Sequence, residues 1–331
     1  MKKKKIYTTL ALFSGGLDSI LAVKILQLQK IKVIPVCFVS PFFNSKNADE
    51  SAKKLNIKLQ IIELKNDYLQ IVKNPKYGYG KNLNPCIDCH SFMYKKLGEI
   101  MPKFEADFLI SGEVLGQRPK SQSTAGLNAV SKLCGYKDLI IRPLSQKLLS
   151  DTKPIKENWI DKAKLYDIQG RSRTRQIDLA EKFGISSYPS PAGGCLLTDE
   201  SYCNRLQDLI ENDMFSSKYI KFLSIGRHFR ISENTKLILG RTKDDNEKLN
   251  NLITDDLITL NSKNYPGPLG VINCKGQLQI DEVELSAQIL LRYITKVKNY
   301  EDVKIEFGKS KYKILKVKKL KSGLECKYLI L

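Results

Sequence analysis

The sequence predicts an α/β fold with a doubly wound parallel sheet, followed by a smaller α+β domain. Between Ile6 and Phe183, apolar β-branched runs alternate with stretches of helical spacing, the pattern of a parallel sheet with crossover helices. After about residue 205 short alternating runs take over, and 331 residues are enough for two domains. We therefore expect one domain over 1–205 and a second, basic domain over 206–331.

The first domain has one expected site, at the carboxyl edge of its sheet. Strands are expected over 6–13, 31–39, 58–64, 107–111 and 139–141, and helices from about Asp18 and over 48–55, 92–101, 153–166 and 173–183. The run at 31–39 is almost continuously apolar, which is typical of a strand buried on both faces. Ligands of such sheets bind where the strands end, so the loops there are the first candidates.

The second domain mixes short strands with helices. Strands are expected within 219–231 and 235–241 and from Val303, and helices over 244–253 and 281–297. This mixture predicts a separate α+β unit.

Composition narrows the class of protein. The chain is 42% hydrophobic, but no apolar run approaches the length of a transmembrane helix. Lys2 to Lys5 precede an apolar run without a small-residue cleavage site, so we expect a cytoplasmic protein without a membrane partner. The net charge of +20 favours a polyanionic partner such as RNA, although lysine-biased composition is an alternative, because only 10 of the 55 basic residues are arginine.

The stretch LFSGGLDSILAVK predicts a phosphate-binding loop. A strand, a glycine turn and a helix form an anion site, because the helix N-terminus offers free N–H groups. Gly15 and Gly16 allow close approach of the backbone, and Ser14 and Ser19 add hydroxyls. Asp18 would repel a bare phosphate, so its presence indicates a bridging Mg²⁺.

Three of the eight cysteines have informative positions. Cys86 and Cys89 form a C-x-x-C before a predicted helix, which favours thiolate, and Cys195 follows two glycines. Three thiolates without an obvious fourth ligand favour an iron–sulfur cluster, such as [4Fe–4S], with one open iron. A persulfide mechanism using Cys86 and Cys195, and a structural zinc site that uses His90, remain alternatives.

The hexapeptide SGGLDS resembles the PP-loop of the ATP-pyrophosphatase superfamily, whose fold is of the adenine nucleotide hydrolase-like type. The segments NPC and SPAGGC resemble the two catalytic cysteine segments of tRNA 2-thiouridine synthases. SGEVLGQRPKSQ and IIRPL resemble segments of tRNA 4-thiouridine synthases. In the second domain, IGRHFRI and LGRTKDDNEKL resemble the RNA-binding domain of NFACT-type ribosome quality-control factors. Because the PP-loop motif starts at residue 14, we expect this chain to lack the N-terminal RNA-binding extension usual in 4-thiouridine synthases.

These resemblances imply an ATP-dependent tRNA sulfurtransferase. ATP would bind at Ser14, Gly15, Gly16, Asp18, Ser19 and, near the adenosine, Gly112. A uridine oxygen would be adenylated with release of pyrophosphate, and sulfur from sulfide or a persulfide-carrying desulfurase would then replace it. Asp18, Cys86 and Cys195 are the expected catalytic residues, and Cys86, Cys89 and Cys195 the expected cluster ligands.

The expected partner is tRNA, and a homodimer is allowed. Two basic runs are candidates for RNA contacts: Arg171, Arg173 and Arg175, and Arg227, His228 and Arg230. The longer SGEVLGQ match favours 4-thiouridine over 2-thiouridine at the wobble position. Two other classes stay open: an RNA-binding protein with a non-catalytic nucleotide site, and a PP-loop enzyme acting on a small molecule.

Overall fold

The computed structural model describes residues 5–190, 194–309 and 312–331. The chain divides into two compact units, Met1–Thr198 and Asp199–Leu331, which are described separately. The boundary expected after residue 205 falls inside helix α8 (Glu200–Glu211), all of which belongs to the second unit.

The first unit is built on a parallel sheet of five strands in the order β3-β2-β1-β4-β5. Its strands are β1 (Thr8–Leu12), β2 (Lys32–Val39), β3 (Gln60–Glu63), β4 (Phe108–Ser111) and β5 (Ile140–Ile141). Its helices are α1 (Leu17–Leu28), α2 (Lys46–Lys54), α3 (Asn66–Lys73), α4 (Cys86–Ile100), α5 (Thr124–Cys134), α6 (Lys153–Lys156) and α7 (Thr174–Lys182). This architecture confirms the predicted doubly wound α/β fold.

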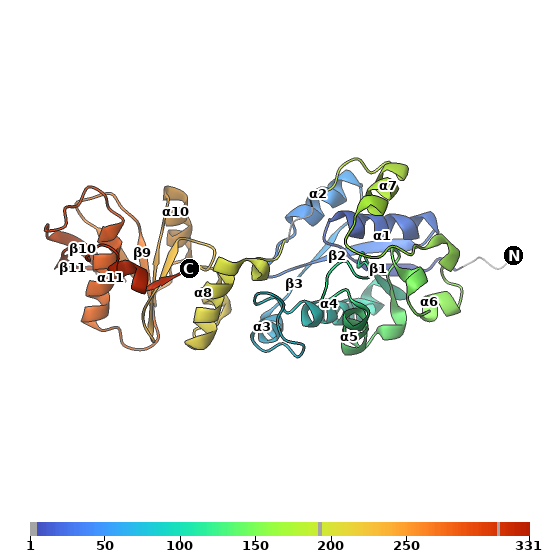
Figure 1. Cartoon of the computed structure of the whole chain (residues 1–331), viewed down its shortest axis with the longest axis horizontal. Coiled ribbons are helices and arrows are strands. Elements are labelled where there is room, and N and C mark those ends of the chain that lie inside the picture. Colours follow the sequence, from blue (N-terminus) through green and yellow to red (C-terminus); the bar gives the residue numbers. More distant parts are fainter. Residues whose placement is uncertain (1–4, 191–193, 310–311) are drawn as a thin grey trace. The chain divides into compact units, whose positions relative to one another are not determined.

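Helices cover both faces of this sheet, with α1, α2 and α7 on one side and α3, α4 and α5 on the other (Figure 1). The chain changes sides after β3, so the strand order reverses between the adjacent strands β1 and β4. Loops leaving two strands at such a reversal diverge and leave a crevice at the carboxyl edge. The loops after β1 and β4 meet at this point.

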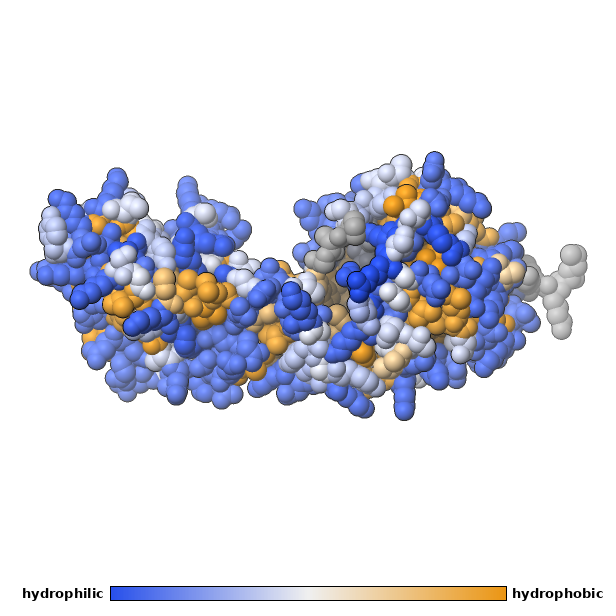
Figure 2. All heavy atoms as spheres, in the orientation of Figure 1, coloured by the Kyte–Doolittle hydropathy of each residue, from blue (hydrophilic) through white to orange (hydrophobic). Residues whose placement is uncertain are grey.

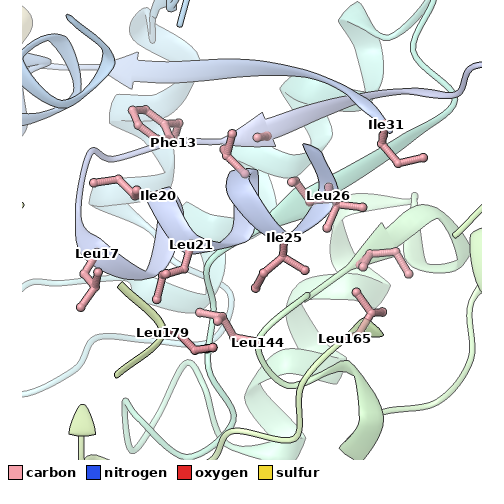
Figure 3. Close-up of a cluster of buried hydrophobic side chains, with 14 of the residues drawn as sticks. Phe13, Leu17, Ile20, Leu21, Ile25, Leu26, Ile31, Leu144, Leu165 and Leu179 are labelled. Carbon is pink, nitrogen blue, oxygen red and sulfur yellow. The ribbon is translucent and has the colours of Figure 1, made fainter. Parts of the chain in front are cut away.

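A hydrophobic cluster fixes α1 against the sheet. Leu17, Leu21 and Ile25 recur at helical spacing and are buried, together with Leu144 and Leu179 from later segments (Figure 3). This packing holds the N-terminus of α1 at the end of β1, where the glycine loop lies.

One helix prediction fails. The helix expected over 153–166 is only the four-residue α6, because Asn158 has a left-handed backbone conformation (φ 54°) that an α-helix cannot continue through.

The second unit contains an antiparallel sheet of seven strands in the order β11-β10-β8-β9-β7-β6-β12. Its strands are β6 (Arg227–Ser232), β7 (Thr235–Leu239), β8 (Ile258–Ser262), β9 (Gly270–Cys274), β10 (Val303–Gly308), β11 (Tyr312–Val317) and β12 (Leu329–Ile330). Its helices are α8, α9 (Ser217–Ile220), α10 (Lys243–Leu252) and α11 (Ile280–Arg292). One sheet face packs on α11 in a core of aliphatic side chains. Hydrophilic residues make up most of the visible surface of each unit, with apolar atoms in separate patches (Figure 2).

Candidate active site

In the glycine loop after β1, Gly15 adopts a left-handed backbone conformation that favours glycine. Gly15 has a φ of +76°, and a Cβ there would lie 2.3 Å from the backbone oxygen of Asn47. Ser19 Oγ donates to the Gly16 carbonyl oxygen at 2.8 Å, and Ser14 is exposed at the start of the turn. The first N–H groups of α1 therefore follow a turn that only glycine fits, as an anion site requires.

The loop after β4 packs directly on this turn. A Cβ on Gly112 would lie 2.4 Å from the backbone carbon of Asp18, so no side chain fits between the two loops. Gly112 therefore lies against the phosphate loop itself.

Asp18 is a half-buried carboxylate with incomplete hydrogen bonding. Gln117 Nε2 donates to its Oδ2 at 3.3 Å, and Arg173 Nη2 lies 3.7 Å from the same oxygen. Its other oxygen, Oδ1, is buried without a hydrogen-bond partner among the described residues. Burial raises the pKa of Asp18, and Arg173 and Gln117 oppose that rise only in part. A bound Mg²⁺ would satisfy this oxygen, so the residues fit the expected ion.

Glu113, the next residue after Gly112, centres a fully bonded buried network. Its carboxylate accepts hydrogen bonds from Arg142 Nε at 2.8 Å and Tyr94 Oη at 2.9 Å, and His90 Nδ1 lies 2.7 Å away. Burial alone would raise the pKa of Glu113, but the charge of Arg142 and the bonds to His90 hold it well below its usual range. This ionised group ties the β4 loop to α4.

Helix α4 carries the C-x-x-C on one face. It begins at Cys86, earlier than expected, so Cys86, Cys89 and His90 stand at positions i, i+3 and i+4 of its first turns. A thiolate was expected near this helix N-terminus, but burial raises the pKa of Cys89 well above its usual range.

Tyr68 of α3 lies at the centre of the cysteine site. Its hydroxyl is 3.1 Å from Cys89 Sγ, and its ring contacts those of Phe43 and Phe92. Burial is the main cause that raises the pKa of this hydroxyl, and the charges of Cys89, Cys195 and Cys86 add to it, so the three cysteines lie in the same neighbourhood.

The segment that contains Cys195 is hydrogen-bonded to two loops of the first unit. The Leu196 amide donates to the Phe42 carbonyl at 2.9 Å, and Asn82 Nδ2 donates to the Thr198 carbonyl at 2.8 Å. Pro191, Ala192 and Gly193 of SPAGGC lie outside the described residues.

The cysteine site does not form a ready-made metal centre. Among residues 5–190, 194–309 and 312–331, no three His, Cys, Asp or Glu side chains stand in positions to hold a metal ion. His90, the fourth ligand of the zinc alternative, is held by Glu113 instead. Three thiols suit a cluster chemically, but their present arrangement does not ligate one.

The second basic run packs within its own unit. His228 is fully buried, with Nε2 2.9 Å from the Ile225 carbonyl oxygen, so its expected RNA contact is wrong. Arg230 forks onto Asp208 with bonds of 2.8 and 2.6 Å, and Arg227 lies over the Tyr293 ring. These side chains are occupied by the fold of the second unit.

The first basic run is divided among different neighbours. Arg173 faces Asp18, Arg175 pairs with Asp167 at 2.6 Å, and Arg171 is exposed. The sequence reasoning had not singled out Glu113 or Tyr68. Glu113 lies in the SGE stretch, so the motif could have indicated it, whereas nothing local marks Tyr68.

Residues 6–168 match the family described as thiamine biosynthesis protein (ThiI), and residues 226–329 match the NFACT protein RNA binding domain. The chain joins a ThiI-family domain to an NFACT-type RNA-binding domain. These matches confirm the family resemblances that SGGLDS and IGRHFRI indicated. The search of curated proteins returned no match.

Three solved structures show distant likeness. The U34-tRNA thiolase NcsA from Methanococcus maripaludis, solved with its [4Fe–4S] cluster, is 18% identical (66% of this chain, 70% of that one, TM-score 0.33). A predicted tRNA methyltransferase subunit from Methanocaldococcus jannaschii is 16% identical (54% and 76%, TM-score 0.32). The C-terminal part of a Streptococcus suis fibronectin/fibrinogen-binding protein is 11% identical (47% and 73%, TM-score 0.29). Such low scores carry no functional conclusion for this chain. No helix in the described parts of the chain is long and apolar enough to cross a bilayer.

Proposed function

We propose that this protein is an ATP-dependent tRNA sulfurtransferase that converts a uridine into a thiouridine, with 4-thiouridine favoured over wobble 2-thiouridine. One observation carries the proposal. A phosphate-type loop and three neighbouring cysteines lie in one unit, and the adjacent residues Gly112 and Glu113 connect the loop to the helix of Cys86 and Cys89. A nucleotide site beside nucleophilic sulfur fits a reaction that activates an oxygen and then replaces it with sulfur.

The first step would use the glycine loop. Ser14, Gly15, Gly16 and Ser19 would bind the phosphates of ATP, and Asp18 would hold Mg²⁺ against them. The uridine oxygen attacks the α-phosphorus, pyrophosphate leaves, and the base carries AMP as a leaving group. The base must leave its stack to reach this site, as in other base-modifying enzymes.

The second step would use the cysteines. A persulfide on Cys195 attacks the activated ring carbon through its terminal sulfur, and AMP leaves. The Cys86 thiolate then attacks Cys195 Sγ, which releases the thiocarbonyl and leaves a Cys86–Cys195 disulfide that an external dithiol reduces.

A [4Fe–4S] cluster held by Cys86, Cys89 and Cys195 is the second candidate, because the three thiols lie in one neighbourhood and thiolates are the usual ligands of such clusters. Such a cluster would supply a coordination position for hydrosulfide. Anaerobic purification with iron and sulfide analysis separates the two routes. A protein that is free of iron and fully active with a persulfide donor excludes the cluster.

The tRNA contacts of the second unit would lie on the open face of β10 and β11. Lys304 and Lys316 are paired across these strands and exposed, as are Tyr312 and Ile314 on the same face. Asn261 of β8 is the pairing partner of Glu306 in β10, so it lies on this face too. Asn261 also lines a groove of about 580 Å³ beside α10. Lysines for phosphates and a tyrosine for stacking suit RNA.

Pyrophosphate release, measured with and without tRNA, tests the proposal. We expect tRNA to stimulate release, and mass spectrometry of the tRNA nucleosides then identifies the thiouridine. Asp18→Ala should abolish release, whereas Cys195→Ala should keep release and lose sulfur insertion. Release that is indifferent to tRNA would favour a small-molecule substrate, and no release at all would favour a non-catalytic RNA-binding protein.

A further inference from the structure

The segment QGRSRTRQ (169–176) forms a wall beside the phosphate loop. Gln169 pairs with Leu115 in a parallel bridge, and the Gly170 amide donates to the Leu115 carbonyl at 2.8 Å. The same β4 loop supplies Gln117, whose amide reaches Asp18. These contacts fix the start of α7 next to the start of α1, and the two helices pack on each other.

Arg173 lies in this wall, and its guanidinium group has fewer hydrogen bonds among the described residues than it can make. Its Nη2 lies 3.7 Å from Asp18 Oδ2, which is too far for a hydrogen bond. Its Nε is buried and has no hydrogen-bond partner within the described part of the chain. The guanidinium is therefore held near Asp18 by charge alone, with donors to spare.

Gln176, one turn further along, is the second unusual group. Its side chain is fully buried, and neither Nε2 nor Oε1 has a hydrogen-bond partner among the described residues. The amide still lies near enough to Asp18 to lower the pKa of that carboxyl. Gln176 and Arg173 thus both lie next to the Asp18 carboxylate.

These buried, unpartnered atoms have a shared meaning. Each unsatisfied buried polar group costs about 1–3 kcal/mol, so these atoms of Asp18, Arg173 and Gln176 would together be a large loss without a ligand. Arg173 Nε and Gln176 Nε2 are donors that suit phosphate oxygens, whereas Asp18 Oδ1 and Gln176 Oε1 are acceptors that suit a hydrated cation. A magnesium-bound polyphosphate supplies both.

We propose that Arg173 and Gln176 form the second wall of the nucleotide site, opposite the glycine loop. Arg173 neutralises Asp18 before the nucleotide binds and moves to a phosphate group when Mg²⁺ binds the carboxylate. Gln176 orients Asp18 and the water shell of the cation. This inference rests on the proposed function and removes Arg173 from the expected RNA contacts.

Nucleotide binding to the full-length chain tests it directly. Calorimetry with Mg²⁺ and α,β-methylene-ATP, which cannot release pyrophosphate, measures affinity without tRNA or sulfur. We expect Arg173→Ala to weaken binding at least tenfold, Gln176→Ala to weaken it several-fold, and Arg173→Lys to recover part of the loss. Thermal melting of each variant shows that it is folded, and Arg173→Lys keeps the test valid if Arg173→Ala is not.

Arg175→Ala is the matched control. It removes the same charge from the same segment, but its guanidinium pairs with Asp167 at the surface, so nucleotide affinity should change less than twofold. The proposal is overturned if Arg173→Ala binds the nucleotide like Arg175→Ala. A selective loss of tRNA affinity in Arg173→Ala, measured by gel shift, would return Arg173 to the RNA interface. If nucleotide binding follows our expectation but tRNA is never thiolated, the proposed function fails and this inference stands.

Discussion

Asp18 and Glu113 are two carboxylates at the same edge of one sheet, and their surroundings are opposite. Glu113 is buried with both oxygens bonded, and its pKa is lowered. Asp18 has one buried oxygen without a partner among the described residues, and its pKa is raised. A satisfied buried charge stabilises the framework, whereas an unsatisfied one marks a place where a ligand completes the structure. The comparison therefore separates scaffold from site.

The largest expected effect is on stability, and it comes from removing the negative charge of Glu113, whose carboxylate is fully hydrogen-bonded. Glu113→Gln leaves Arg142 as a buried, unpaired charge, so we expect a loss of about 3–5 kcal/mol in unfolding free energy. Denaturant unfolding at pH 7 measures it. As a control, Glu157→Gln removes an exposed partner of Lys153 and should cost less than about 1 kcal/mol. Equal losses in the two variants would mean that Glu113 is not structural.

The unsatisfied carboxylate should show the reverse behaviour. Asp18→Asn keeps the shape but loses the charge for a cation, so we expect pyrophosphate release to fall about 100- to 1,000-fold. Its unfolding free energy should stay close to that of wild type. A stability loss as large as that of Glu113→Gln would contradict the contrast drawn above.

RNA binding should be independent of both carboxylates. Replacing Lys304 and Lys316 by glutamine should weaken tRNA binding about tenfold and reduce its salt dependence by about two units of slope. Nucleotide affinity should not change. Lys248→Gln is the control, because Lys248 pairs with Asp244 on α10 and is expected to leave tRNA binding unaltered.

The smallest effect is a difference in pH dependence. The lowered pKa of Glu113 gives stability that is complete above about pH 4.3 and is lost as the pH falls, so the gap between wild type and Glu113→Gln should narrow in acid. The raised pKa of Asp18 penalises the folded state above its folded pKa. Asp18→Asn should therefore be slightly more stable at pH 7, by less than about 1 kcal/mol, and equal to wild type below about pH 3.8. Unfolding measurements between pH 3 and 7 check both signs.

The sequence predicted the parallel sheet and the glycine loop, because both depend on local patterns such as the apolar run of β2 and the turn at Gly15. It missed α5, whose N-cap Ser123 was a usable signal, and it gave no sign of the two-residue strand β12, which exists only by pairing with β6. Isolated short strands carry almost no pattern of their own.

Contacts between distant residues were beyond sequence reasoning. QGRSRTRQ and GRHFR look alike as basic runs, yet Arg173 faces Asp18 and Arg230 faces Asp208. Only tertiary packing decides whether an arginine meets solvent, an acid or a ligand. The grouping of Cys195 with the C-x-x-C was expected from the resemblance, but the contact of Cys89 with Tyr68 was not.

Gly112 and Glu113 are neighbours in the chain, one pressed against the phosphate loop and the other holding the helix of Cys86 and Cys89. The single peptide unit that joins Gly112 to Glu113 thus sets the distance between two places. An oxygen would be activated at the first, and sulfur would be delivered at the second. Neither place can shift relative to the other without moving that peptide. A methyl group added at position 112 would consequently disturb both the activation of the oxygen and the delivery of sulfur.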